Sequence, residues 1–142
     1  MTDNSMEILV GDGQLALAGQ LAPSLGESFI HALAAQDFKS LELLYQPAAH
    51  FRAVVPSEEM QGKTAGEAAG LFRDWFGSYD SVQILQSTAI PVFDRLYLSY
   101  RLRFHDSKDG WQVVEQHAFC IVQEDRIVDM WLICSGFRPD LE

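Results

Sequence analysis

Apolar and polar side chains alternate with a period of two along most of the chain between residues 81 and 134. Successive side chains of a strand point to opposite faces of a sheet, so this alternation predicts consecutive β-strands. We expect strands at 81–93, 96–105, 111–123 and 127–134, with turns at Asp94-Arg95, 107–110 and Glu124-Asp125. Both faces of the last strand are mostly apolar. This indicates that both are covered, one by the core and the other by a second subunit.

A helical period precedes these strands. Residues 24–37 predict a helix in which Ser24 is the N-cap and Glu27 occupies the capping-box position. A short helix at 38–45 follows, and a third helix begins at or near Thr64 and runs to about residue 79. Its stripe of Ala68, Leu71, Phe72, Trp75 and Phe76 is more typical of a core than of a ligand site. Between these helices, 50–55 alternates as a short strand and 56–62 reads as a polar loop.

Helices followed by a run of strands are typical of an α+β domain. The helices are the only available cover for the apolar face of the strands. We therefore expect a cone-shaped, curved antiparallel sheet wrapped over the N-terminal helices, with an internal pocket. Residues 24–142 form this single domain, and residues 1–23 form an N-terminal arm that packs on the body or on a partner, or a small hairpin.

The faces of the strands follow from the turn lengths. A two- or four-residue loop within 107–110 and a two-residue turn at 124–125 bring the apolar positions of three strands onto one face. Three polar residues interrupt that face: Tyr100, Glu115 and His117. Ala118, Asp129, Trp131 and Ile133 fall on the opposite face, and we expect Ala118, Trp131 and Ile133 to form a homodimer interface.

Composition narrows the functional classes. With 142 residues, 48% apolar content and a formal net charge of −10, the chain is an ordinary globular domain, without the basic footprint of a nucleic-acid-binding protein. No apolar run is long enough to cross a bilayer, and the acidic N-terminus lacks a signal-peptide pattern, so a cytoplasmic location without membrane contact is expected.

Cys120 and Cys134 are predicted to be reduced, since their parities put them on opposite faces, and two cysteines do not form a metal cluster.

The candidate chemistry centres on Glu115 and His117. These residues are two apart on one strand face, with Cβ atoms ~7 Å apart. One interpretation makes His117 a general acid/base, Glu115 the residue that orients it, and Tyr100 a hydrogen-bond donor, with no cofactor and no metal. The other makes them a buried, hydrogen-bonded structural pair. Arg52 either holds an acidic ligand or forms a surface ion pair. The expected pocket lining is completed by Phe29, Phe72, Trp75, Phe119, Met130 and Leu132.

The order of the elements, the helix TAGEAAGLFRDWF and the ending DRIVDMWLICSGFRP resemble the nuclear transport factor two-like superfamily, whose cystatin-like α+β fold is a cone. The resemblance covers about residues 24–138 and is strongest to the SnoaL-like and ketosteroid-isomerase-like branch. It implies that His117 takes the place of a cavity-facing acidic residue of the isomerases. It also places their general base near Ala53, where this chain has no carboxylate. SnoaL-type cyclases likewise have a cavity histidine, and their acidic partner corresponds to Asp129.

Two functions follow as hypotheses. The first is a cofactor-free enzyme that isomerises, cyclises or hydrates a small hydrophobic molecule, cyclic, steroid-like or polyketide-like, in the cone. The second is a non-catalytic dimer that binds a ligand or serves as an association module.

Overall fold

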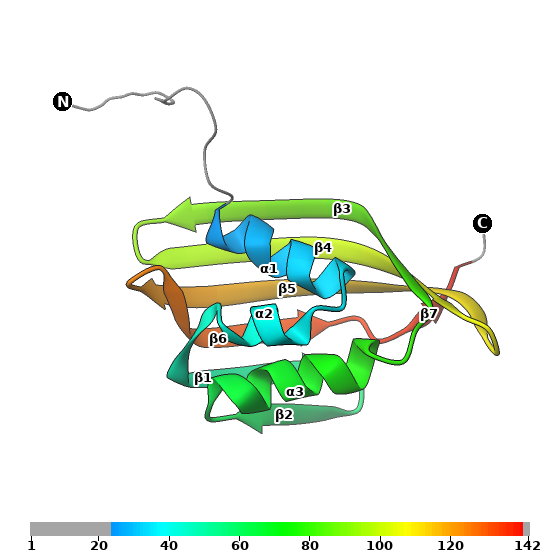
Figure 1. Cartoon of the computed structure of the whole chain (residues 1–142), viewed down its shortest axis with the longest axis horizontal. Coiled ribbons are helices and arrows are strands. Elements are labelled where there is room, and N and C mark those ends of the chain that lie inside the picture. The colour runs from blue at the N-terminus through cyan, green and yellow to red at the C-terminus, as the bar shows by residue number, and fades with distance from the viewer. Residues whose placement is uncertain (1–23, 141–142) are drawn as a thin grey trace, which may run out of the picture.

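The computed structural model describes residues 24–140, which fold into three α-helices and a curved, open sheet of seven strands (Figure 1). The elements in chain order are α1 (Leu25–Ala34), α2 (Phe38–Glu42), β1 (Tyr45–Val55), β2 (Glu58–Gly62), α3 (Ala65–Phe76), β3 (Ser81–Val92), β4 (Arg95–Asp106), β5 (Gly110–Gln123), β6 (Arg126–Cys134) and β7 (Arg138–Pro139). The helices cover one face of the sheet, called here the inner face. This arrangement confirms the predicted α+β class. The arm expected at residues 1–23 lies outside the described residues.

The strands follow the order β2-β1-β6-β5-β4-β3, and β7 pairs with β5. The sheet is mixed, because β1 runs parallel to β6 while the other pairs are antiparallel. The segment expected to be a polar loop contains β2, which pairs with β1 from Phe51↔Gly62 to Val55↔Glu58. Most of β2 is polar and exposed, as suits a short strand at the edge of a sheet, so it lacks the alternation that would have revealed it.

The N-caps of α1 and α3 are those that the sequence predicts. Ser24 and Glu27 form a complete capping box at the start of α1. The Thr64 hydroxyl accepts a hydrogen bond from the Glu67 backbone N–H at the start of α3, and Gly77 ends that helix. Each such cap satisfies a backbone donor that the helix leaves unpaired. Helix α3 thereby turns Ala68, Phe72 and the rest of its apolar stripe toward the sheet.

Helix α1 lies unusually close to β3 and β4. A Cβ atom at Gly26 would stand 2.6 Å from the Cβ of Ala89 and 2.8 Å from the Cδ2 of Leu98, closer than such atoms can approach. Only glycine fits here, and its missing side chain sets the distance between helix and sheet.

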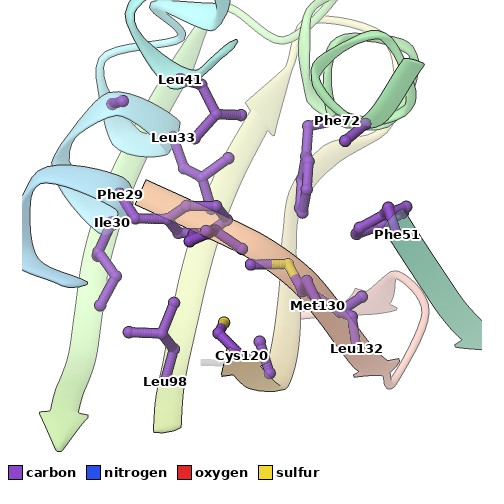
Figure 2. Packing of buried hydrophobic residues seen from close by; sticks show 14 of the residues in the cluster. Phe29, Ile30, Leu33, Leu41, Phe51, Phe72, Leu98, Cys120, Met130 and Leu132 are labelled. Carbon is purple, nitrogen blue, oxygen red and sulfur yellow. The ribbon is translucent and has the colours of Figure 1, made fainter. Parts of the chain in front are cut away.

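Aromatic side chains fill the space between the helices and the inner face. Figure 2 shows side chains from α1, α3, β1 and β6 meeting there. The largest of the buried side chains are at most 1% exposed: Phe29, Tyr45, Phe51, Phe72, Phe76, Tyr100 and Phe104. Many of the rings meet edge to face, as Phe29 and Phe72 do with centroids 5.6 Å apart at 83°. The burial of each such ring contributes roughly 1.5–3 kcal/mol, so this layer is the main source of stability.

Strand β5 faces the opposite way from the prediction. The loop before it has three residues, 107–109, because Asp106 pairs with Gly110, whose φ is +79°. An odd loop length pairs Leu98 with Ala118, so the even positions of β5 point inward. A bulge between Ile121 and Val122 then shifts the register again. The two shifts cancel for β6, whose Met130 and Leu132 face inward as predicted, and only β5 is inverted.

The two cysteines are free thiols, as predicted, although the reason differs. Both lie on the inner face, Cys120 opposite Met130 and Cys134 opposite Gln116. Four pairing positions separate them along the strands, roughly 13 Å at the strand rise, which is too far for a disulfide. Burial, followed by the nearby charge of Asp129, raises the pKa of the Cys120 thiol to about 12, so this thiol stays neutral.

Candidate functional site

The inversion of β5 changes the faces of the predicted catalytic residues. Glu115 and His117 point away from the helices, onto the face called here the outer face, while Gln116 between them is fully buried. Tyr100 stays on the inner face, where its hydroxyl donates to the Oε1 of Gln116 at 2.5 Å. The predicted grouping of Tyr100 with Glu115 and His117 is therefore wrong, because the sheet lies between them.

The predicted ligand-binding residues divide in the same way. Phe29, Phe72, Met130 and Leu132 have no exposed surface and belong to the core, and Trp75 is half-buried beside them. Phe119, predicted to face inward, lies on the outer face with 55% of its surface exposed. Ala118 is fully buried on the inner face, so it cannot belong to an interface on the outer one.

A chain of four side chains crosses β4 and β5 on the outer face. The Tyr97 hydroxyl lies 2.7 Å from Nδ1 of His117, and Nε2 of His117 lies 2.8 Å from Oε2 of Glu115. The other carboxylate oxygen of Glu115 accepts from Arg101 Nη2 at 3.1 Å. An ionised Glu115 carboxylate has no proton and can only accept hydrogen bonds. Neutral His117 therefore carries its proton on Nε2, which donates to Glu115, and the Tyr97 hydroxyl donates to Nδ1. The predicted contact between Glu115 and His117 is confirmed, on the opposite face.

The electrostatics of these four hydrogen-bonded side chains favour the ionised form of the Glu115 carboxylate. The hydrogen bond from His117, and then that from Arg101, lowers the pKa of Glu115 below its ordinary value. About two fifths of each of the Arg101, His117 and Glu115 side chains is in contact with water, so screening weakens these ion pairs. These hydrogen bonds hold His117 in one orientation and join it to the Tyr97 hydroxyl.

An open hollow of about 380 Å³ lies on the outer face beside this chain. Two cross-strand rows of side chains line it. One row is Val92, Arg95, Ile121 and Asp129, and the other is Ile90, Tyr97, Phe119, Trp131 and Arg52. The lining is mainly apolar, with a few polar groups, and its volume is within the range of small-molecule sites. The Arg52 guanidinium lies over the Trp131 ring, 4.3 Å from its centroid.

The predicted site lacked two residues, Gln116 and Tyr97, which form hydrogen bonds to Tyr100 and His117. Gln116 has the same parity as Ala118, which the sequence predicts on the face away from the helices, and a polar side chain there gives no signal of a site. Its Nε2 donates to Cys134 Sγ at 3.2 Å, so the buried amide is hydrogen-bonded at both ends. Tyr97 lies diagonally across from His117, a relation that appears only once the β4–β5 register is known. Ala53, near the expected general-base position, is fully buried and offers no base.

The described part of the chain has no group of three or more His, Cys, Asp or Glu side chains placed to hold a metal ion. Its helices are also too short to span a membrane.

Comparison with known proteins gives a fold. No family model matches the sequence, and no curated protein matches it. A hypothetical protein with a ketosteroid-isomerase-like fold from Catenulispora acidiphila, solved in complex with trimethylamine, matches with a TM-score of 0.66 at 11% identity, over 82% of this chain and 88% of that one. A SnoaL-like polyketide cyclase described as putative, from Shewanella putrefaciens, matches with a TM-score of 0.61 at 8% identity, over 78% and 77%.

A nuclear transport factor two-like protein of unknown function from Cytophaga hutchinsonii matches with a TM-score of 0.55 at 12% identity, over 81% of this chain and 88% of that one. This protein has the nuclear transport factor two-like fold. Another structure with this fold, AusH from Aspergillus nidulans, matches with a TM-score of 0.61 at 18% identity, over 79% of this chain and 82% of that one. At these identities the nuclear transport factor two-like fold is shared, and the reaction is not determined by it.

Proposed function

We propose that this nuclear transport factor two-like domain is a non-catalytic association module that pairs with a second copy of itself through the outer face. The observation that carries this proposal is the exposure of large apolar side chains there. Phe119 is 55% exposed, Ile133 50% and Trp131 49%, on the adjacent strands β5 and β6. Val54, Ile90 and Val92 extend the same surface over β1 and β3. Contiguous apolar surface of this kind is rare on monomers and marks sites of association.

The charge distribution supports the same face. The chain has a formal net charge of −10, so two copies repel each other over most of their surfaces. The outward positions of β1, β3, β4, β5 and β6 carry four arginines, at positions 52, 95, 101 and 103, and two carboxylates, Glu115 and Asp129, while Glu59 on β2 adds a third carboxylate beside Val54. The outward positions of the sheet are therefore less acidic than the chain as a whole, which favours the approach of two copies through this face.

The test is the oligomeric state at micromolar concentration, measured by analytical ultracentrifugation. The wild-type chain should sediment as a dimer. The double variant Trp131→Glu/Ile133→Glu should be monomeric, because it places charges in the centre of the interface. Leu43→Glu is the matched control, since Leu43 is 64% exposed and lies between α2 and β1, away from the outer face. A wild-type monomer, or a double variant that remains dimeric, would contradict the proposal.

The hydrogen-bonded chain favours a second candidate function, acid–base chemistry on a small hydrophobic molecule in the outer hollow. Tyr97 lines the hollow and its hydroxyl donates to His117, so His117 can take up the phenolic proton while Glu115 holds its other nitrogen. Both ring nitrogens are engaged, so a substrate would meet Tyr97 and not the imidazole itself.

Cyclic ketones and epoxides are suitable test substrates, since structural neighbours include a ketosteroid-isomerase-like protein and an epoxide hydrolase. Turnover by the wild-type chain that is lost in both Tyr97→Phe and His117→Gln, with unchanged circular dichroism, would support this second function. Absence of wild-type turnover, or turnover that survives both substitutions, would count against it.

A further inference from the structure

The turn between β3 and β4 exposes an aromatic ring in a strained backbone conformation. Phe93 is fully exposed, at 103%, and its φ of +54° lies in the left-handed region that suits glycine or asparagine. A bulky residue strains the backbone in this conformation, and the ring gains no burial within its own chain. An outlier of this kind suggests a role outside the folded monomer. Asp94, which follows it, carries an exposed carboxylate.

The outer hollow holds a cation without a carboxylate partner. Among the described residues, no carboxylate lies within 4.0 Å of the Arg52 guanidinium, although the chain contains 20 acidic residues. Asp129 also lines the hollow, yet lies beyond that distance. The contact with Trp131 fixes the plane of the guanidinium, so its N–H groups are already oriented for an incoming anion. The hollow therefore combines an apolar lining with one prepared site for a negative charge.

The order of the strands relates the exposed turn to the hollow. Among the five strands that line the hollow, β1-β6-β5-β4-β3, β5 is the middle strand, and β2 lies beyond β1 at the sheet edge. When two outer faces pack about a twofold axis along β5, β3 and β4 of one copy lie over β1 and β6 of the other. The β3–β4 turn and the hollow are also at the same end of the sheet, since Val92 pairs with Arg95, Arg95 with Ile121, and Ile121 with Asp129. The axis thus brings the turn of each copy to the Arg52–Trp131 side of its partner.

We propose that the β3–β4 turn of each copy enters the outer hollow of the other, with the Phe93 ring against Trp131 and Phe119 and the Asp94 carboxylate on the Arg52 guanidinium. This inference rests on the proposed pairing of outer faces and names the residues that fix its register. Asp94 is now paired with Arg95 at 3.1 Å, but about three fifths of each side chain is in contact with water. An ion pair this exposed contributes little, so Asp94 can exchange Arg95 for Arg52 at low cost.

Charge reversal tests the contact between copies. Arg52→Glu and Asp94→Arg should each weaken the dimer about tenfold or more, because each homodimer then contains two like-charged contacts. An equimolar mixture of the two variants should recover dimers, since one contact in the mixed dimer is the natural pair and the other is the reversed pair. Lys39→Glu, on α2 away from the outer face, is the control for the change in net charge. Sedimentation equilibrium of each variant and of the mixture gives the dissociation constants.

Phe93→Gly provides an independent test, because it should stabilise the monomer and weaken the dimer. Glycine relieves the positive φ, so the unfolding midpoint of dilute monomer should rise. Removal of the aromatic ring should raise the dissociation constant of the dimer about tenfold or more. A general loss of structure would lower both the midpoint and the affinity, so it would be recognised as such.

The outcomes separate this inference from the proposal on which it depends. A dimeric wild type whose affinity is unchanged by Arg52→Glu and Asp94→Arg, or whose weakened variants do not recover on mixing, overturns the exchange of turns and leaves the pairing of outer faces intact. A monomeric wild type overturns both. Wild-type assemblies larger than two overturn the closed exchange, because they require an open, head-to-tail contact.

Discussion

Phe72 and Phe119 are the same residue type on opposite sides of one sheet. Phe72, which packs from α3 onto the inner face, has no surface in contact with water, whereas Phe119 on the outer face is 55% exposed. Their polar neighbours differ in the same way. Gln116 is buried and bonded to neutral partners, while the adjacent Glu115 is bonded to Arg101 and His117 at the surface. The inner face is complete within one chain, so we infer that it provides stability. The outer face has unused apolar surface, so we infer that it serves association.

The largest difference between the faces should appear when each phenylalanine is truncated. Phe72→Ala is expected to lower the free energy of unfolding by about 3–5 kcal/mol, because it leaves a cavity in a packed core. Phe119→Ala should change the free energy of unfolding of the dilute monomer by about 0.5 kcal/mol or less. It should weaken the dimer instead. Urea denaturation at nanomolar and micromolar concentrations separates the two effects. Equal losses in the dilute monomer would remove the distinction between the faces.

A smaller effect should follow from the buried amide. Gln116→Leu leaves the Tyr100 hydroxyl without its acceptor, and an unsatisfied buried group costs about 1–3 kcal/mol. In the double variant Tyr100→Phe/Gln116→Leu both partners are apolar, so most of the loss should be recovered. Thermal unfolding of the two single variants and the double variant gives the coupling. Additive losses would mean that the hydrogen bond contributes nothing specific.

The smallest effect concerns Glu115 on the outer face. Its pKa is lowered in the folded state, so its ionised form stabilises the fold above the ordinary pKa of 4.5, and this contribution is lost as the pH falls through the lowered value. Glu115→Gln should therefore be slightly less stable than wild type at pH 7, and this deficit should shrink as the pH falls below 4.5. Chemical denaturation at a series of pH values from 7 downward is the measurement, and a deficit that does not shrink with falling pH would exclude this origin.

Most of the fold follows from local patterns in the sequence. The capping box at Ser24, the cap at Thr64 and the alternation of β4 and β6 all predict elements that the structure contains. Strand β2 could not be predicted this way, because Glu58 and Glu59 lie on an exposed strand that needs no apolar side. Such an element is defined by its pairing with β1, which is a property of the tertiary structure.

The sequence did not determine which side chains of β5 point inward, and this limited the prediction of the site. The letters SKDG are compatible with loops of two, three or four residues, and the loop length decides whether Gln116 or His117 points inward. The bulge at Ile121 gives no sequence signal, because both sides of the strand are largely apolar there. The pairing of Glu115 with His117 survived the error, since residues two apart on a strand share a face whichever face that is.

The closeness of α1 to the sheet has a consequence for engineering. At Gly26 a single hydrogen atom stands where any other amino acid would press on Ala89 and Leu98. A methyl group introduced there would act as a wedge and tilt the first turns of α1 outward. Position 26 is thus a point at which the spacing between the helix layer and the sheet can be changed by a single substitution.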